Sequence, residues 1–173
     1  KAPASQSFYG HIGNAELVRG ISDLYSLCRL IEQQEVSSRL YEELNKAAAK
    51  LFDDHYWLPE TPELPLADLI KEVSETAELV IDEFEKVKSI RRESAKAMVE
   101  AEELQTAILR EVRPENWNSA EDYVNALTKL RNQRGHLITI SEYRYIDTGR
   151  IDELSREIEE VESDLNEKTV AFL

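Results

Sequence analysis

Apolar residues recur at steps of three and four along most of this chain, which is the spacing of one face of an α-helix. The pattern predicts one helix over residues 15–34 and a second over about 36–57. We expect these two helices to pack as an antiparallel hairpin, with Asn14 capping the first through its side-chain oxygen. Residues 1–13 are expected to be a lead-in without regular structure. An N-terminal helical hairpin lobe is therefore predicted over residues 1–58.

A much longer helix is predicted over residues 66–112, a segment that contains neither glycine nor proline. Positions that alternate steps of four and three through this segment form a heptad pattern, which is typical of a coiled-coil helix. The three polar exceptions to the apolar pattern are Arg91, Ser94 and Gln105. Such a helix is about 70 Å long and needs a partner along its length. Three prolines make residues 59–65 a stiff linker between this helix and the N-terminal lobe.

The rest of the chain is expected to return along the long helix. After a turn at residues 114–118, capped by either Asn118 with Glu121 or Ser119 with Asp122, a helix is predicted to end near Gly135. A linker with a β-prone run is expected at residues 135–149. A last helix is predicted from about Arg150. Its inward-facing positions, which we call its seam, again follow steps of three and four, at Ile151, Leu154, Ile158, Val161, Leu165, Lys168 and Phe172. The predicted fold class is all-α, and residues 66–173 are expected to form a long antiparallel coiled-coil arm with an interrupted return strand.

The composition narrows the possible classes of protein. The single cysteine, Cys28, excludes an internal disulfide framework and a multi-thiolate zinc site, and its apolar neighbours predict a buried position. No apolar run is long enough to span a membrane and no signal peptide is visible, so we expect a cytoplasmic location and no membrane partner. From its two ends we expect the sequence to be a fragment of a longer protein.

The common catalytic motifs are missing from the sequence. It contains no phosphate-binding glycine loop, no Gly-x-Ser-x-Gly elbow and no Glu-x-x-His pair. Asp53, Asp54 and His55 are adjacent, but successive helix positions point in different directions and make a poor chelate. We interpret His55 as a core or helix-end residue rather than a metal ligand. We therefore predict no catalytic residue, no metal site and no cofactor in this chain.

Basic residues are concentrated in two windows of a chain whose net charge is −14. Residues 86–96 and 129–150 are expected to lie side by side where the return path is interrupted. The candidate residues for binding a partner or a phosphate are Lys86, Lys88, Arg91, Arg92, Lys96, Arg131, Arg134, Arg144 and Tyr145, with Tyr143 as a further stacking group. The alternative is that these cations pair with nearby acids and mark a structural joint. The acidic surroundings favour that alternative.

Several segments resemble a known family. They are residues 38–44, with the sequence SRLYEEL, residues 75–87, with ETAELVIDEFEKV, residues 130–138, with LRNQRGHLI, residues 144–147, with RYID, and the final VAFL. Together they resemble a helical region of large bacterial proteins described as DNA-repair ATPases, in which long helical regions accompany an AAA-type ATPase module. The resemblance extends over most of the chain after about Tyr9. It implies a non-catalytic arm, with ATP and Mg²⁺ bound only by the rest of the parent protein.

Three classes of function remain open. The preferred one is a helical region of a larger ATPase that serves interdomain docking, oligomerisation or protein-partner binding. Its partners would be other domains of the parent protein or a second copy of the chain. The second class is a nucleic-acid-binding arm that uses basic windows 86–96 and 129–150, which the net charge disfavours. The third is a free-standing helical enzyme.

Overall fold

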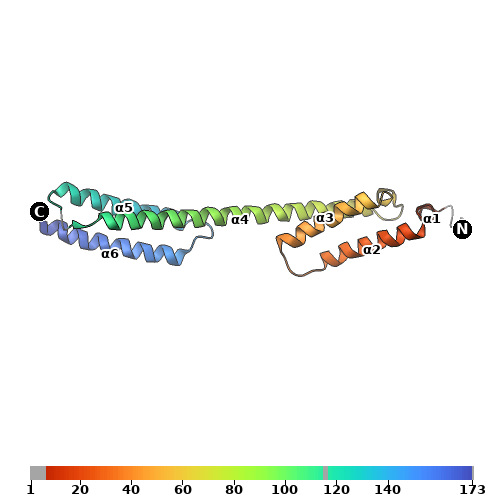
Figure 1. Ribbon diagram of the computed structural model, residues 1–173, viewed down its shortest axis with the longest axis horizontal. Helices are drawn as coiled ribbons and strands as arrows, with labels where there is room; N and C mark the ends of the chain where they lie inside the picture. Colours follow the sequence, from red (N-terminus) through yellow and green to blue (C-terminus); the bar gives the residue numbers. More distant parts are fainter. Residues whose placement is uncertain (1–6, 115–116, 173) are drawn as a thin grey trace. The chain divides into compact units, whose positions relative to one another are not determined.

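The computed structural model describes residues 7–114 and 117–172, and its regular structure within these ranges is entirely helical (Figure 1). The prediction of an all-α fold is therefore confirmed. The predicted turn at residues 114–118 lies partly outside the described residues. The α-helices are α1 (Phe8–Ile12), α2 (Asn14–Ile31), α3 (Ser38–Asp54), α4 (Leu66–Glu111), α5 (Ala120–Ser141) and α6 (Thr148–Phe172), with a short 3₁₀ helix, η2, at Leu58–Glu60.

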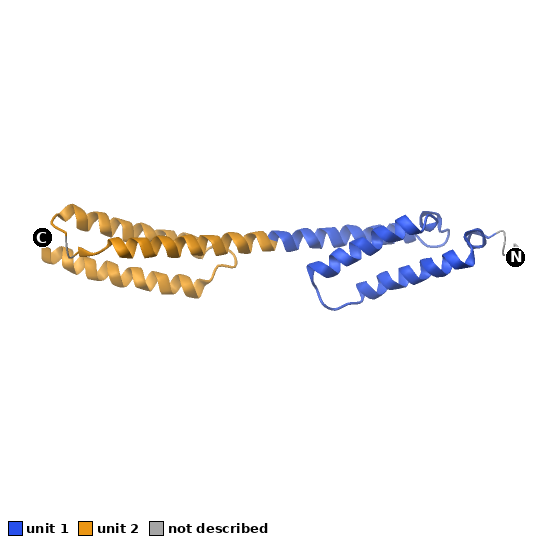
Figure 2. Ribbon diagram, viewed as in Figure 1, with its two compact units in different colours: residues 1–86 blue, residues 87–173 orange. Residues whose placement is uncertain are grey.

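The chain divides into two compact units, residues 1–86 (unit 1) and residues 87–173 (unit 2), and α4 contributes to both (Figure 2). This division differs from the predicted lobe boundary at residues 59–65. The reason is that the first part of α4 belongs to the N-terminal core, where Ile70 and Ala77 are buried together with residues of α2 and α3. The prolines end one helix and start the next without separating two cores.

In unit 1, α2 and α3 run antiparallel beside each other, and the first part of α4 completes the core (Figure 1). The predicted lead-in, residues 1–13, contains α1, whose first turn is capped by the Ser7 side chain, which accepts a hydrogen bond from the Gly10 N–H at 3.1 Å. Residues 1–6 of the lead-in lie outside the described residues. Phe8 and Ile12 of α1 then pack against the core. The core consists of Leu27, Leu40, Leu44, Ala48, Leu51, Trp57, Leu58, Ile70 and Ala77.

The ends of α2 and α3 differ in detail from the prediction. Asn14 is the first residue of α2 and not its cap, which is Gly13 with φ 91°. Ser37 caps α3 by accepting a hydrogen bond from the Leu40 N–H at 3.2 Å, so residue 36 lies in the connector and not in the helix. Helix α3 ends at Asp54, and His55 follows it as the C-cap.

In unit 2, α5 and α6 run antiparallel beside each other and pack against the second part of α4 (Figure 1). Ser119 caps α5 with a hydrogen bond from the Asp122 N–H at 3.3 Å, which confirms one of the two predicted caps. The predicted linker at 135–149 was wrong in its first half, because α5 continues through Gly135 to Ser141. Leu137 and Ile140 are buried in the core, and this packing outweighs the glycine and the β-propensity of the run.

The predicted return path also needs correction. The prediction placed the last two helices end to end along one long partner helix. Instead, a short connector at residues 142–147 reverses the chain and α6 lies beside α5. The physical reason is the shared apolar face: the seam residues of α6 pack with those of α5 and α4 in one core. Its members are Ala101, Ile108, Tyr123, Ala126, Leu130, Leu137, Ile140, Ile151, Leu154, Ile158 and Leu165.

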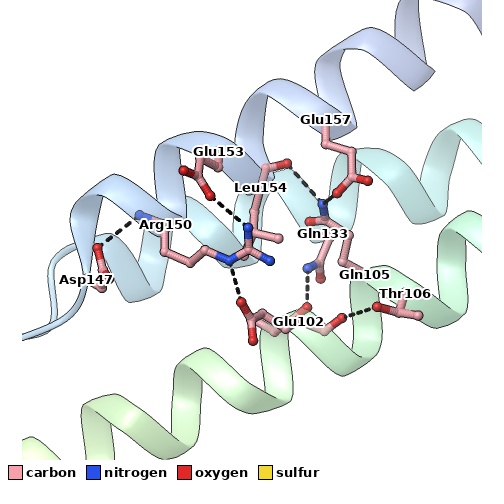
Figure 3. A network of polar contacts seen from close by, with 10 residues as sticks. Glu102, Gln105, Thr106, Gln133, Asp147, Arg150, Glu153, Leu154 and Glu157 are labelled. Carbon is pink, nitrogen blue, oxygen red and sulfur yellow. Dashed lines mark hydrogen bonds and ion pairs between the residues drawn. The ribbon is translucent and has the colours of Figure 1, made fainter.

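Burial along α4 follows the predicted heptad positions, which are 66, 70, 73, 77, 80, 84, 87, 91, 94, 98, 101, 105, 108 and 112. Every one of these positions from 66 to 112 is buried or half-buried except Arg91, which is exposed. Ser94 and Gln105, the other polar exceptions, are buried in unit 2. Gln105 donates from Nε2 to the Leu154 carbonyl at 3.1 Å and to Glu157, and Gln133 donates to the Ala101 carbonyl at 2.9 Å (Figure 3). Buried amides therefore join α4 to both of its neighbours, Gln105 to α6 and Gln133 to α5.

Candidate functional site

Most of the predicted basic residues are engaged by acids of the chain itself. Lys86 pairs with Glu83 at 2.6 Å and Lys96 with Glu100 at 3.5 Å, each within α4. The pKa of Lys86 is raised by its hydrogen bond to Glu83. Lys88 also has a partner. These contacts agree with the interpretation that these cations serve local helix structure.

Arg131 and Arg134 form a structural joint between α5 and α6. Their guanidinium groups contact the two carboxylate oxygens of Glu162 at 3.0 and 3.1 Å, and Glu162 is buried. A buried carboxylate needs such partners, because burying a charge without compensation is costly. These two arginines therefore stabilise unit 2 by compensating the charge of Glu162.

Three other predicted residues do come together, at the connector between α5 and α6. The Cζ atom of Arg91 lies 4.8 Å from the centre of the Tyr145 ring, and the Cζ atom of Arg144 lies 5.1 Å from the same centre. The buried hydroxyl of Ser94 donates to the Arg144 carbonyl at 2.6 Å and ties the connector to α4. The two basic windows thus meet at Arg91, Arg144 and Tyr145, which we call the arginine–tyrosine cluster.

The arginines of this cluster are free of carboxylates. Within the described parts of the chain, Arg91, Arg144 and the neighbouring Arg92 form no ion pair, and all three are exposed. Tyr143, two residues before Tyr145, is also exposed. The cluster therefore combines unpaired guanidinium groups with aromatic rings at the surface.

A polar pocket of about 320 Å³ lies beside Gln105 in unit 2. Arg150 lines it and is held by Glu102 and by Glu153, the latter at 2.8 Å (Figure 3). These two hydrogen bonds raise the pKa of Arg150. Arg150, one of the two arginines that line this pocket, is therefore already neutralised by the chain.

The most buried ionisable group lies in unit 1 and was not singled out as a site from the sequence. His55 is fully buried, its Nδ1 lies 2.8 Å from Glu16 Oε1, and its Nε2 lies 2.9 Å from Asp23 Oδ2. Since each ring nitrogen faces a carboxylate oxygen, both donate and the imidazole is in its charged form. The interpretation of His55 as a core residue at a helix end agrees with this position.

Electrostatics explain the protonation state of His55. Burial lowers the pKa of His55, but the hydrogen bonds and charges of Asp23 and Glu16 raise it by more, so the pKa lies above its ordinary value of 6.5. The hydrogen bond from His55 lowers the pKa of Glu16 from 4.5. Glu16 and Asp23 are seven residues apart, two helical turns, so their shared position on the inner face of α2 was the signal in the sequence that could have revealed the pairing.

Trp57 completes this cluster. Its ring centre lies 5.8 Å from that of His55, and the ring packs directly on Gly20 of α2. A Cβ atom at position 20 would lie 2.4 Å from Trp57 Cζ2, so only glycine permits this contact. The His55 cluster therefore fixes how α2 meets the end of α3.

The outward face of α2 carries apolar side chains that the chain does not cover. Val18, Ile21 and Tyr25 are 68%, 62% and 63% exposed, and Cys28 is exposed as well. Their steps of three, four and three place them in one stripe, which we call the α2 stripe. The prediction that Cys28 is buried was wrong, because the inner face of α2 is occupied by Gly20 and Leu27.

An apolar groove of about 400 Å³ lies in the same unit, where the α2–α3 connector meets α3 and α4. Ile31 lines it, one helical turn after Cys28, and Val36 and Leu69 are exposed at its walls. Its other apolar lining residues are Leu40, Tyr41, Leu44, Val73 and Ala77.

The described residues contain neither a cluster of metal ligands nor a membrane-spanning helix. No group of three or more His, Cys, Asp or Glu side chains there is placed to hold a metal ion. None of the helices described is long and apolar enough to cross a membrane.

A family model matches the N-terminal part of the chain. The profile of a family described as "ATPase involved in DNA repair" matches residues 1–56. This range includes α1, α2, α3 and His55 but none of α4, α5 or α6. The N-terminal part of the chain is therefore similar to a segment of that family. No curated protein and no solved structure matches the chain.

Proposed function

We propose that this chain is a non-catalytic helical region that docks onto an ATPase of the matched family through the α2 stripe. The single observation that carries this proposal is the stripe itself, with four exposed apolar side chains along three turns of one helix. Contiguous exposed apolar surface of this kind is typical of a protein interaction site. All four residues lie within the matched range 1–56.

Charge around the stripe supports a specific kind of partner. Glu16 and Asp23, the two acids within the body of α2, both turn inward to His55. The outward face between residues 17 and 31 therefore carries no carboxylate, although the chain has a net charge of −14. Arg29 remains at the exposed edge. The complementary partner surface is an apolar helix face flanked by acidic side chains, docked as a helix against a helix.

The His55 cluster supports the proposal from inside the unit. A binding face needs a rigid scaffold behind it, since mobile side chains lose entropy on binding. His55 and Trp57 anchor the inner face of α2, so the stripe is presented by a helix whose orientation is fixed. The groove beyond Ile31 extends the apolar surface at the C-terminal end of α2.

The test is a binding titration of the full chain with a purified ATPase of the matched family. Ile21→Glu and Tyr25→Glu should each weaken binding at least about tenfold, because each places a charge in a desolvated contact. Ile138→Glu is the matched control: Ile138 is 60% exposed on α5 of unit 2, and its variant should bind like the wild type.

Two results would overturn the proposal. One is a wild-type chain that does not bind the ATPase, or an Ile21→Glu variant that binds equally well. The other is self-association, seen by light scattering across protein concentration, that Ile21→Glu abolishes. That result would assign the α2 stripe to a second copy of the chain instead of an ATPase.

A further inference from the structure

The arginine–tyrosine cluster contrasts with the other cations of the two basic windows, residues 86–96 and 129–150. Lys96, Lys129, Arg131, Arg134 and Arg150 all contact carboxylates. Arg91, Arg92 and Arg144 form no ion pair with any described residue. In a chain with 35 acidic residues, three neighbouring arginines without an acid partner form a local positive site.

The cluster is also held in place before any ligand arrives. Ser94 is buried and donates to the Arg144 carbonyl, so the connector is fixed to α4 at that point. Tyr145 has φ 67°, a left-handed conformation that a bulky side chain rarely adopts. Both guanidinium groups stack on its ring, and stacking leaves the N–H edges of a guanidinium available for an anion.

From these contacts we infer that the arginine–tyrosine cluster, with Arg92 and Tyr143, binds a short stretch of single-stranded nucleic acid. The arginines contact phosphates, for which a planar guanidinium offers paired donors. Tyr143 is 45% exposed and has no ring contact with a described residue, so its face is open for stacking on a base. Tyr145 acts as the platform that positions Arg91 and Arg144.

The observations favour a single strand over the other polyanions. A duplex presents a long charged surface, and the acidic remainder of the chain repels it. An acidic peptide would use the arginines but would leave the exposed Tyr143 ring without a role. A single strand satisfies both, because its bases are unpaired and can stack on an exposed aromatic side chain. This inference goes beyond the proposed docking function and involves the other unit of the chain.

The experiment is fluorescence anisotropy of a short labelled oligothymidylate titrated with the full chain at several salt concentrations. The logarithm of the binding constant should fall with the logarithm of salt with a slope of about −2, the value for three phosphate contacts on a single strand. The double variant Arg91→Gln/Arg144→Gln should lose binding at least about tenfold. Arg92→Gln should reduce the slope by about 0.7.

The tyrosine variants separate stacking from charge. Tyr143→Ala should weaken binding without changing the salt slope, and Tyr143→Phe should restore it, because the ring face is retained. Arg39→Gln is the matched control: Arg39 is an exposed arginine on α3 of unit 1, and its loss should leave binding unchanged. Circular dichroism of each variant checks that the helices remain folded.

The outcomes that overturn the inference are distinct. No anisotropy change at low salt removes the site altogether. Equal competition by an oligoglutamate peptide would mean that the site recognises charge alone, and equal binding of a duplex would remove the preference for a single strand. Ile21→Glu should bind the oligonucleotide normally, so failure here is distinguishable from failure of the docking proposal.

Discussion

In unit 1 the central buried polar group is a charged imidazole between two carboxylates, His55. Unit 2 instead buries two neutral amides at its centre, Gln105 and Gln133, together with one carboxylate, Glu162, that two arginines compensate. In each unit two antiparallel helices pack with a part of α4 around a core, and the short α1 adds to the core of unit 1. The chemistry of burial nevertheless differs. A charged group is stabilised only while its partners stay ionised, and a neutral amide is independent of pH near neutrality. Because their buried polar groups differ, two units of similar architecture respond differently to substitution and pH.

The largest expected effect concerns His55. His55→Ala should lower the free energy of unfolding of unit 1 by about 3 kcal/mol, because it opens a cavity and leaves Glu16 and Asp23 facing each other without a cation. Urea unfolding gives the size of the loss, and hydrogen exchange resolved to peptides locates it in α2 and α3. An equal loss of protection in α5 and α6 would contradict the assignment to unit 1.

The next largest effect is opposite in sign in the two units. Gly20→Ala should destabilise unit 1 by about 2 kcal/mol, since the new Cβ atom overlaps Trp57 Cζ2. Gly135→Ala on α5 should stabilise unit 2 by about 1 kcal/mol, because nothing lies within 4 Å of its Cβ position and alanine favours a helix. Thermal unfolding of the two variants tests the pair. Shifts in the same direction would contradict the packing described for Gly20.

A smaller effect is expected for the buried amides. Gln133→Met should stabilise unit 2 by about 1 kcal/mol, because the Gln133 Oε1 atom is buried with no hydrogen-bond partner and methionine fills the same volume. Urea unfolding measures the change, with hydrogen exchange of α5 as the local readout. A destabilised variant would mean that the donation to the Ala101 carbonyl outweighs the unpaired oxygen.

The smallest effect is the pH dependence of unit 1, because Glu16 and Asp23 remain partly open to solvent. The raised pKa of His55 contributes stability that is fully present below pH 6.5 and is lost as the pH rises through the folded-state value. The lowered pKa of Glu16 contributes stability that is present above pH 4.5 and is lost as the pH falls through its folded-state value. Both contributions are present in full between pH 4.5 and pH 6.5, so unit 1 should be most stable in that range.

Hydrogen exchange across pH tests this prediction. Protection of α2 and α3 should decline above neutrality, while α5 and α6, which bury no histidine, should keep theirs. His55→Ala is the control, since it should remove the decline at high pH. A wild-type α2 whose protection does not change with pH would contradict the ion-paired state of His55.

Periodicity alone predicted the long helix and the face that it buries. Helix α4 runs from Leu66 to Glu111 against a prediction of 66–112, and Arg91 is the one heptad position left exposed. The seam positions Ile151, Leu154, Ile158 and Leu165 of α6 are buried and Val161 is half-buried, whereas the last two predicted seam positions, Lys168 and Phe172, are exposed. These features are local, because a heptad repeat specifies both helix and inner face without reference to a partner.

The candidate sites were predictable only in part. The gathering of Arg91 with Arg144 and Tyr145 was expected from the two basic windows. Pairing of cations with nearby acids was the favoured alternative, but the sequence did not identify Glu162 as the shared partner of Arg131 and Arg134. The number of charged residues in a stretch of sequence does not reveal which basic side chain contacts which acidic side chain in the folded chain. Only the three-dimensional arrangement separates an occupied arginine from a free one.

By itself, then, the sequence determined the all-helical class, the extent of α4 and the inner faces of α4 and α6, because helical periodicity is written in local spacing. Tertiary structure decided the rest. It extended α5 through Gly135, folded α6 back beside it, turned Glu16 and Asp23 inward to His55 and left the α2 stripe uncovered. These outcomes depend on contacts between residues distant in the chain, whose burial outweighs the local preferences of each segment.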